Sequence, residues 1–162
     1  MIRNVSLSDA PRIAEIYNYY INNTIITFEE TEIDAGEIER RIQHVREKHF
    51  PYIVYEEDGR LLAYAYIDNW RSRSAYDISL ETSIYLDIHA TGKGIGPVLY
   101  RELITKSKEI NIHSLIGVIS LPNEASRKLH ERLGFRLVGN FRESGLKFNR
   151  LIDVEFWQLI LS

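Results

Sequence analysis

Three closely spaced glycines, Gly92, Gly94 and Gly96, lie near the middle of the chain, with Lys93 between the first two. A segment of alternating character that indicates a strand (residues 78–86) precedes them, and an amphipathic pattern that indicates a helix begins near Gly96. The backbone N–H groups of a first helical turn have no intrahelical partner and carry partial positive charge. Because glycine has no Cβ, it allows those groups to approach a phosphate closely. The spacing therefore predicts a phosphate-binding loop, although an ordinary turn between a strand and a helix would also use glycine.

Two common phosphate motifs do not match this loop. A P-loop ends in Lys-Ser or Lys-Thr, and neither pair follows the glycines here. The dinucleotide-binding fingerprint has the spacing G-x-G-x-x-G, whereas this chain has G-x-G-x-G. These two classes of nucleotide site are therefore excluded for the loop.

Glu81 lies within the predicted strand that leads into the glycine loop. Strict alternation places Glu81 on the same face as Ser79, Ser83, Tyr85 and Asp87, opposite a face formed by Ile78, Leu80, Thr82, Ile84 and Leu86. A carboxylate in this position is a candidate general base. The alternative is a carboxylate on the solvent side of a half-buried strand.

The chain has 162 residues, of which 44% are hydrophobic and 27% charged, and its net charge is −3. This composition predicts one globular domain, residues 1–162. The acidic balance argues against nucleic acid or an anionic membrane as a partner. No apolar run reaches the length of about 18 residues that a membrane span requires, and the N-terminus lacks a signal-peptide layout, so we expect a cytoplasmic location. The absence of cysteine excludes disulfides and a Cys nucleophile.

The periodicities of the whole chain predict the element order β-α-α-β-β-β-α-β-α-β-β. Asp58-Gly59 predicts a hairpin between strands at residues 52–55 and 61–67. Asn123 is a predicted N-cap of a short helix at residues 124–133, and Gly134 a predicted C-terminal stop. The closing strands are expected at residues 135–139, extended towards 142, and 152–161. Hairpins dominate this order, so we expect an α/β fold of the α+β type with a largely antiparallel sheet.

The glycine loop resembles the Q/R-x-x-G-x-G/A loop that holds the pyrophosphate of acetyl-CoA in the GNAT superfamily of N-acetyltransferases. Gly94 and Gly96 match its glycines, and Thr91 stands where the family has Gln or Arg. Within the superfamily, the chain resembles the phosphinothricin and methionine sulfoximine N-acetyltransferases almost from end to end. The segments that carry this resemblance are Ile16–Ile21, Trp70–Asp77, Glu81–Leu86, Gly92–Gly96, Leu121–Asn123, Leu129–Phe135, Gly145–Phe148 and Asp153–Gln158. The resemblance implies the GNAT fold, with six or seven strands and about four flanking helices.

The resemblance also implies roles for individual residues. It places the family's general base at Glu81 and an acid/base or orienting histidine at His130, whose alternative is a locally satisfied helix residue. Pantetheine is expected along the backbone of Ile84, Tyr85 and Leu86, and the pyrophosphate in the loop formed by Gly92, Lys93, Gly94, Ile95, Gly96 and Pro97. Asn123 matches an asparagine that contacts the cofactor, a role compatible with capping. Because His130 has no further ligand at metal spacing, no metal site is predicted.

A small amino-acid acceptor requires a cation for its carboxylate and an enclosed, largely apolar pocket. The candidates for these roles are Phe28, Arg71, Arg73, Ala75, Tyr76 and Lys147. Each single arginine could equally be a solvated surface residue. The resemblance further implies a homodimer.

We therefore expect an acetyl-CoA-dependent N-acetyltransferase that acts on the free α-amine of a small amino-acid analogue, such as phosphinothricin or methionine sulfoximine. One alternative is the same fold acting on a protein N-terminus or a polyamine. A non-catalytic acyl-CoA-binding sensor is the other, and the presence of Glu81 argues against it.

Overall fold

The computed structural model describes residues 1–161. Within them a seven-stranded sheet has the order β1-β2-β3-β4-β5-β7-β6, and all neighbours are antiparallel except β4 and β5. The strands are β1 (Ile2–Asn4), β2 (Tyr52–Glu57), β3 (Arg60–Asn69), β4 (Ser79–Leu86), β5 (Ser114–Ser120), β6 (Arg136–Lys147) and β7 (Arg150–Ile160). The α-helices are α1 (Ala10–Asn23), α2 (Ala35–Glu47), α3 (Ile95–Glu109) and α4 (Glu124–Arg132). The predicted α/β fold class and element order are confirmed.

Local signals in the sequence account for most element boundaries. The Asp34 side chain accepts a hydrogen bond from Glu37 N (2.8 Å) at the start of α2, and Asn123 Oδ1 accepts one from Ser126 N (3.2 Å) at the start of α4. Asp58 and Gly59 both have positive φ in the β2–β3 hairpin. These caps and turns therefore lie where the sequence predicts them.

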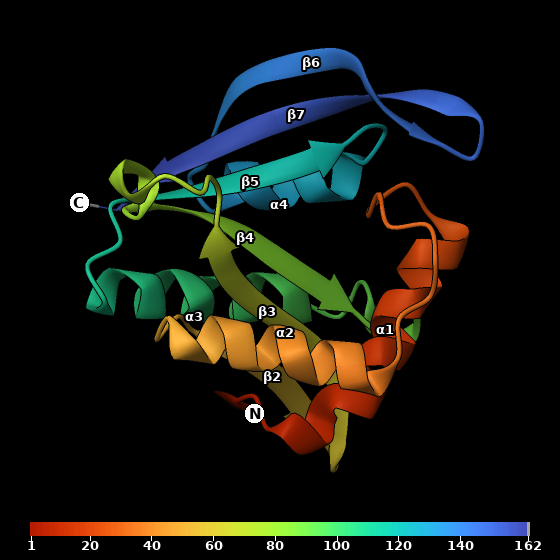
Figure 1. Cartoon of the computed structure of the whole chain (residues 1–162), viewed down its shortest axis with the longest axis vertical. Helices are drawn as coiled ribbons and strands as arrows, with labels where there is room; N and C mark the ends of the chain where they lie inside the picture. The colour runs from red at the N-terminus through yellow and green to blue at the C-terminus, as the bar shows by residue number, and fades with distance from the viewer. Residues whose placement is uncertain (162) are drawn as a thin grey trace.

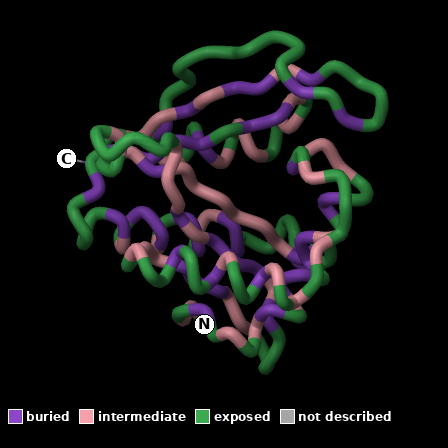
Figure 2. Tube along the Cα trace, viewed as in Figure 1, coloured by how far each residue is buried: buried purple, intermediate pink, exposed green. Residues whose placement is uncertain are grey.

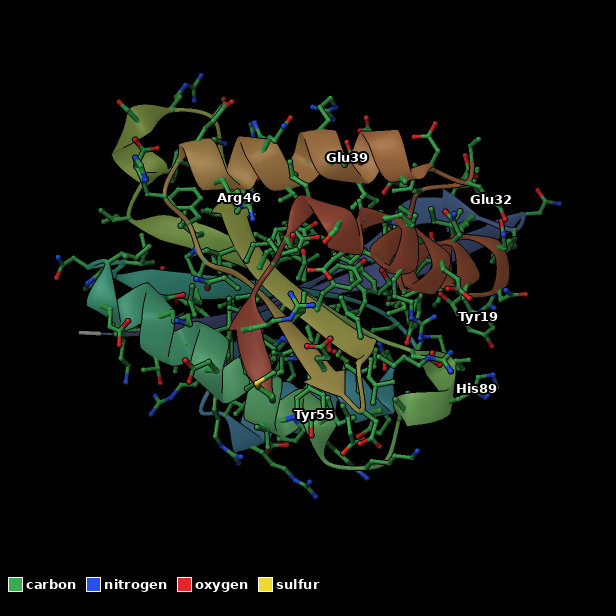
Figure 3. All side chains as sticks on the ribbon, turned by 90° about the horizontal axis from the view of Figure 1, so that it is seen from below. Tyr19, Glu32, Glu39, Arg46, Tyr55 and His89 are labelled. Atoms are coloured by element: carbon green, nitrogen blue, oxygen red, sulfur yellow. The ribbon has the colours of Figure 1, made fainter. Side chains whose placement is uncertain are left out.

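Helices cover both faces of the sheet and divide the core in two (Figure 1). One cluster packs α3 against β3, β4 and β5, and the other packs α1 and α2 against β2 and β3. Figure 3 shows this arrangement from another side: α1 and α2 lie on one side of the strands, and α3 lies on the other side. The β6–β7 hairpin extends beyond the helices, and the tube in Figure 2 is exposed along most of β6.

The closing hairpin is longer than the sequence predicts. The strands expected at residues 135–142 and 152–161 are β6 at residues 136–147 and β7 at residues 150–160. Most of β6 is exposed on both faces, so its residues lack the apolar alternation that marks a half-buried strand. Its extent follows from backbone pairing with β7 rather than from side-chain periodicity.

The sheet divides between β4 and β5. These strands pair in parallel only from Ser79–Ser114 to Glu81–Ile116. Beyond Glu81 the strand β5 continues to pair with β7, while β4 continues to pair with β3 (Figure 1). The two halves of the sheet diverge from this point, and a wedge opens between them.

Candidate functional site

A cavity of about 330 Å³ lies in the wedge between β4 and β5. All four helices and the loop before α2 contribute to its lining, together with both strands. Its polar side chains include Glu81, Thr82, Tyr100, Asn123, Ser126 and His130. The structure therefore brings both predicted catalytic residues, and the predicted cofactor ligand Asn123, to one cavity.

Glu81 is half-buried at the point where β4 and β5 part. Burial raises the pKa of its carboxyl group, and the charge of Asp68, its cross-strand partner on β3, raises it further. Asp68 is itself paired with Lys48 Nζ at 3.1 Å. A carboxylate with a raised pKa that lines a cavity has the properties of a general base for an ammonium group.

His130 is 5% exposed and lines the same cavity from α4. Its Nδ1 lies 2.8 Å from the backbone oxygen of Ser126, and its Nε2 lies 2.9 Å from the Tyr100 hydroxyl. Burial lowers the pKa of the imidazole, while the hydrogen bond to the Ser126 carbonyl opposes that effect. The lowered pKa favours the neutral imidazole at neutral pH, and both ring nitrogens have hydrogen-bond partners.

The glycine loop forms the N-terminus of α3, which begins at Ile95 with Gly94 as its N-cap. Gly92 and Gly94 have φ of 76° and 81°, and a Cβ at either would have no atom within 4 Å. Positive φ favours glycine at both positions, and the open space leaves their backbone accessible. Lys93 is exposed beside them. This loop has the geometry and charge of a phosphate site at a helix N-terminus.

An ion pair anchors the chain between β4 and this loop. The buried carboxylate of Asp87 pairs with Arg12 from α1 and accepts a hydrogen bond from His89 N at 2.8 Å. The Tyr20 hydroxyl, also from α1, donates to the backbone oxygen of Leu86 at 2.5 Å. The His89 side chain projects away from the body of the protein (Figure 3). These contacts fix the end of β4 relative to α1 without using the backbone of residues 92–97.

Ile84, Tyr85 and Leu86 occupy the part of β4 that has lost β5 as a neighbour. Tyr85 packs its ring against Tyr17 and Tyr64 on one face of the sheet, and Ile84 and Leu86 pack against the core beneath α3. The predicted alternation along this strand is therefore confirmed. The backbone of these three residues therefore borders the wedge on the side where β5 no longer pairs with β4.

Two of the predicted acceptor residues lie at the loop that covers the cavity. Phe28 lines the cavity, and its ring lies so close to Gly145 that a Cβ there would be 2.3 Å from Cζ. Lys147 is 1% exposed, and its Nζ donates to the backbone oxygens of Thr24 and Thr27 at 2.8 and 2.7 Å. The Lys147 ammonium thus holds the loop that carries Phe28.

The other predicted acceptor residues lie elsewhere. Arg71, Arg73, Ala75 and Tyr76 belong to the segment between β3 and β4, and none of them lines the Glu81 cavity. The Arg71 guanidinium lies 4.9 Å from the ring centroid of Trp70, and this residue lines a separate groove of about 490 Å³ with residues of β6 and β7. Within one chain, the structure therefore separates these four residues from Glu81.

Several polar residues of the cavity were not predicted from the sequence, among them Thr82, Tyr100 and Arg41. Arg41 reaches from α2 to Glu29 with a 2.6 Å ion pair, and this contact lowers the pKa of the Glu29 carboxyl group. Tyr100 lies within the apolar stripe of α3, and its hydroxyl group is the only feature that could have marked it as a site residue in the sequence. The Arg41–Glu29 and Thr82–Tyr100 contacts each join two different elements of the fold.

Within residues 1–161 the structure contains no group of three or more His, Asp or Glu side chains suited to a metal ion. No helix of the same residues is both long enough and apolar enough to cross a membrane.

The acetyltransferase (GNAT) domain family matches residues 2–156. The chain is 37% identical over 158 residues to a phosphinothricin N-acetyltransferase from Alcaligenes faecalis, which covers 97% of this chain and 80% of that protein. It is 32% identical over 161 residues to an L-methionine sulfoximine/L-methionine sulfone acetyltransferase from Pseudomonas aeruginosa, with 99% and 94% covered. A solved GNAT superfamily phosphinothricin acetyltransferase from Sinorhizobium meliloti, in complex with acetyl-CoA, superposes with a TM-score of 0.97 at 35% identity, covering 100% of this chain and 88% of that one.

Proposed function

This chain belongs to the GNAT family of N-acetyltransferases, and on that premise we propose that it acetylates the free α-amino group of a small amino-acid analogue. Phosphinothricin and methionine sulfoximine or sulfone, which the names of its relatives specify, are the leading acceptors. The acetyl group is supplied by acetyl-CoA, which the Sinorhizobium meliloti structure contains.

The residues of the wedge and the glycine loop fit acetyl-CoA. Backbone N–H groups of residues 92–96 and the Lys93 ammonium hold the pyrophosphate, because they combine positive charge with an approach free of Cβ atoms at Gly92 and Gly94; Pro97 adds no donor and follows at the start of α3. The backbone of Ile84, Tyr85 and Leu86 pairs with the pantetheine arm along the part of β4 that β5 has left. Asn123 keeps its capping role and faces the same cavity.

Glu81 acts as the general base, and the position of this half-buried carboxylate in the wall of the cavity is the observation that carries the proposal. Burial there raises the pKa of the carboxyl group, in the direction that suits a base. An α-ammonium must lose a proton before its nitrogen can attack the thioester. Glu81 accepts that proton, and transfer from acetyl-CoA to the amine is direct. His130, which lines the same cavity from α4, assists the transfer.

The acceptor is held next to the cavity. Phe28 forms a wall for the acceptor side chain, and Lys147 supplies a cation beside the loop that carries Phe28. Arg71, Arg73, Ala75 and Tyr76 remain proposed contacts because the resemblance suggests them. A glutamine at Arg71 or Arg73 should raise KM for a carboxylate-bearing acceptor if either arginine binds the carboxylate.

We also propose a homodimer. Large apolar side chains lie exposed along the β6–β7 hairpin, including Val138 at 66%, Phe141 at 62% and Leu151 at 61%. An apolar surface of this kind on an edge strand favours association with another protein surface. Sedimentation equilibrium measures the mass directly, and a monomer at micromolar concentration would contradict this proposal.

The test is release of thiol from acetyl-CoA, with phosphinothricin, methionine sulfoximine, spermidine and a short peptide as parallel acceptors. Fast release with the first two alone supports the proposed acceptor class. Glu81→Gln should retain acetyl-CoA binding and lower kcat about 10²-fold or more at neutral pH. Glu57→Gln, on the exposed end of β2, is the matched control and should leave kcat unchanged. Release with spermidine or peptide alone would refute the acceptor, and full activity of Glu81→Gln would refute the base.

A further inference from the structure

A line of hydrogen bonds connects the cavity to His130 through two residues that have no assigned role. Thr82 Oγ1 on β4 lies 2.5 Å from the Tyr100 hydroxyl on α3, and that hydroxyl lies 2.9 Å from His130 Nε2 on α4. His130 Nδ1 then lies 2.8 Å from the backbone oxygen of Ser126. Thr82, Tyr100 and His130 all contribute to the wall of the cavity.

When His130 is neutral, the backbone carbonyl at one end of this line fixes the direction of every hydrogen bond. A carbonyl only accepts, so His130 Nδ1 carries the proton and the neutral ring accepts at Nε2. The Tyr100 hydroxyl must therefore donate to Nε2, and its oxygen accepts from Thr82. In this arrangement the Thr82 oxygen still has an acceptor site at the cavity wall.

The same groups also form a complete set of hydrogen bonds when His130 carries two protons. Nε2 then donates to the Tyr100 oxygen, and Tyr100 donates to Thr82. The Thr82 hydroxyl finds an acceptor in the backbone oxygen of Ile116, 3.4 Å away. The line of groups thus has two arrangements that differ by one proton and require no movement of heavy atoms.

Packing holds the histidine in place for both arrangements. The His130 ring makes edge-on contacts with Tyr100 and Phe135, with centroid distances of 5.2 and 4.9 Å. The Cδ2 and Nε2 atoms of the ring lie against Gly117, where a Cβ would be only 2.6 Å from each of them. The glycine therefore provides the space that lets the ring reach Tyr100.

We propose that Thr82 and Tyr100 connect the buried His130 to the cavity as a two-state proton relay. This inference rests on the proposed function, in which Glu81 has already removed the ammonium proton. As the N–C bond forms and the C–S bond breaks, the acceptor nitrogen must lose one further proton and the CoA sulfur must gain one. The relay takes the first proton through the Thr82 hydroxyl to Nε2 and returns one to the sulfur by the reverse path, so His130 ends neutral.

The first test requires no activity. Nitrogen-15 NMR of the imidazole should show His130 of the whole protein with its proton on Nδ1 and a hydrogen-bonded, unprotonated Nε2 at neutral pH. In Tyr100→Phe the Nε2 resonance should shift, because its donor has been removed. A wild-type tautomer with the proton on Nε2, or an Nε2 resonance that Tyr100→Phe leaves unchanged, would overturn the relay.

The second test is kinetic and uses single and double variants. Tyr100→Phe and Thr82→Val should each lower kcat by about 10²-fold, in the range for lost acid–base catalysis, and leave KM for acetyl-CoA within about twofold. The double variant should be no slower than either single one within about threefold, since residues that act as a unit are not additive. Thr82→Ser keeps the hydroxyl and should restore most of kcat.

Ser107→Ala is the matched control, because it removes another buried hydroxyl from α3, one that donates to Leu103 O at 2.7 Å away from the relay. It should leave kcat unchanged. Full kcat in Tyr100→Phe, or a double variant with the product of the single losses, would overturn the inference. Inactivity of the wild type towards every amine would instead refute the proposed function, while the tautomer measurement still judges the relay alone.

Discussion

Replacement of Gly117 by alanine should force the His130 ring out of its position. A Cβ at Gly117 would lie 2.6 Å from both Cδ2 and Nε2 of that ring, well inside the ordinary contact range of 3.4–4 Å. The ring is 5% exposed and packs against Tyr100, Phe135 and Trp157, so a shift away from Gly117 disturbs these contacts or moves the ring into the cavity that it lines. The added methyl group must therefore displace the buried ring from its place against Tyr100.

Two opposing contributions set the size of the effect. Overpacking a core costs about 1–3 kcal/mol, whereas replacement of glycine by alanine in a compatible conformation gains about 0.4–1 kcal/mol through the unfolded chain. The net loss should be about 1–2 kcal/mol of unfolding free energy. For a chain of this length, each kcal/mol lowers Tm by about 2–4 °C. We therefore expect Tm to fall by about 2–8 °C.

Gly139→Ala is the control for this measurement. Gly139 also lies in a strand, its φ is not positive, and a Cβ there would have nothing within 4 Å. Urea unfolding and calorimetry should find this variant as stable as the wild type or slightly more stable. Gly117→Ala should also lower kcat, since the His130–Tyr100 hydrogen bond is disturbed. Equal stability of the two variants would refute the steric argument, whatever their activities.

Three further predictions concern the walls of the cavity. Glu81→Gln should raise the unfolding free energy at pH 7.5. Burial raises the folded-state pKa of Glu81 above the unfolded value of 4.5, so the charged carboxylate destabilises the fold. The gain should vanish below about pH 4, where the carboxyl group is protonated in both states. A gain that persists at low pH would contradict this origin. Gly145→Ala should change KM for the acceptor but lower Tm less than Gly117→Ala, because the displaced Phe28 side chain is 41% exposed and can rotate. Acceptor titrations and calorimetry test this, and a loss of Tm larger than that of Gly117→Ala would contradict it. Lys147→Met leaves the backbone oxygens of Thr24 and Thr27 without their donor, and each buried unsatisfied group costs about 1–3 kcal/mol of unfolding free energy. Amide hydrogen exchange in residues 24–29 should therefore become faster. Unchanged exchange there would show that Lys147 does not hold the loop.

Local patterns in the sequence were sufficient for the element order and most boundaries. Asp58-Gly59, Asn123 and Gly134 each impose a backbone conformation or satisfy a helix end with near neighbours, so their positions predict turns and caps. Alternation in residues 79–86 likewise identified the two faces of β4, because one face packs beneath α3. The family follows from the motifs and is confirmed by the comparisons; the roles of the individual site residues remain predictions.

Only the tertiary structure decided which distant residues meet. The relay joins Thr82, Tyr100 and His130 from three elements, and nothing in the local sequence of any one of them specifies the other two. The sequence makes Lys147 a candidate acceptor contact, and this remains a proposal; only the structure shows that a long closing hairpin brings its ammonium to a loop more than a hundred residues earlier in the chain. The wedge itself exists because β5 pairs with β7 after Glu81, while β4 remains with β3. Periodicity and caps report the environment of each segment, whereas pairing between strands depends on the competition among all segments for partners.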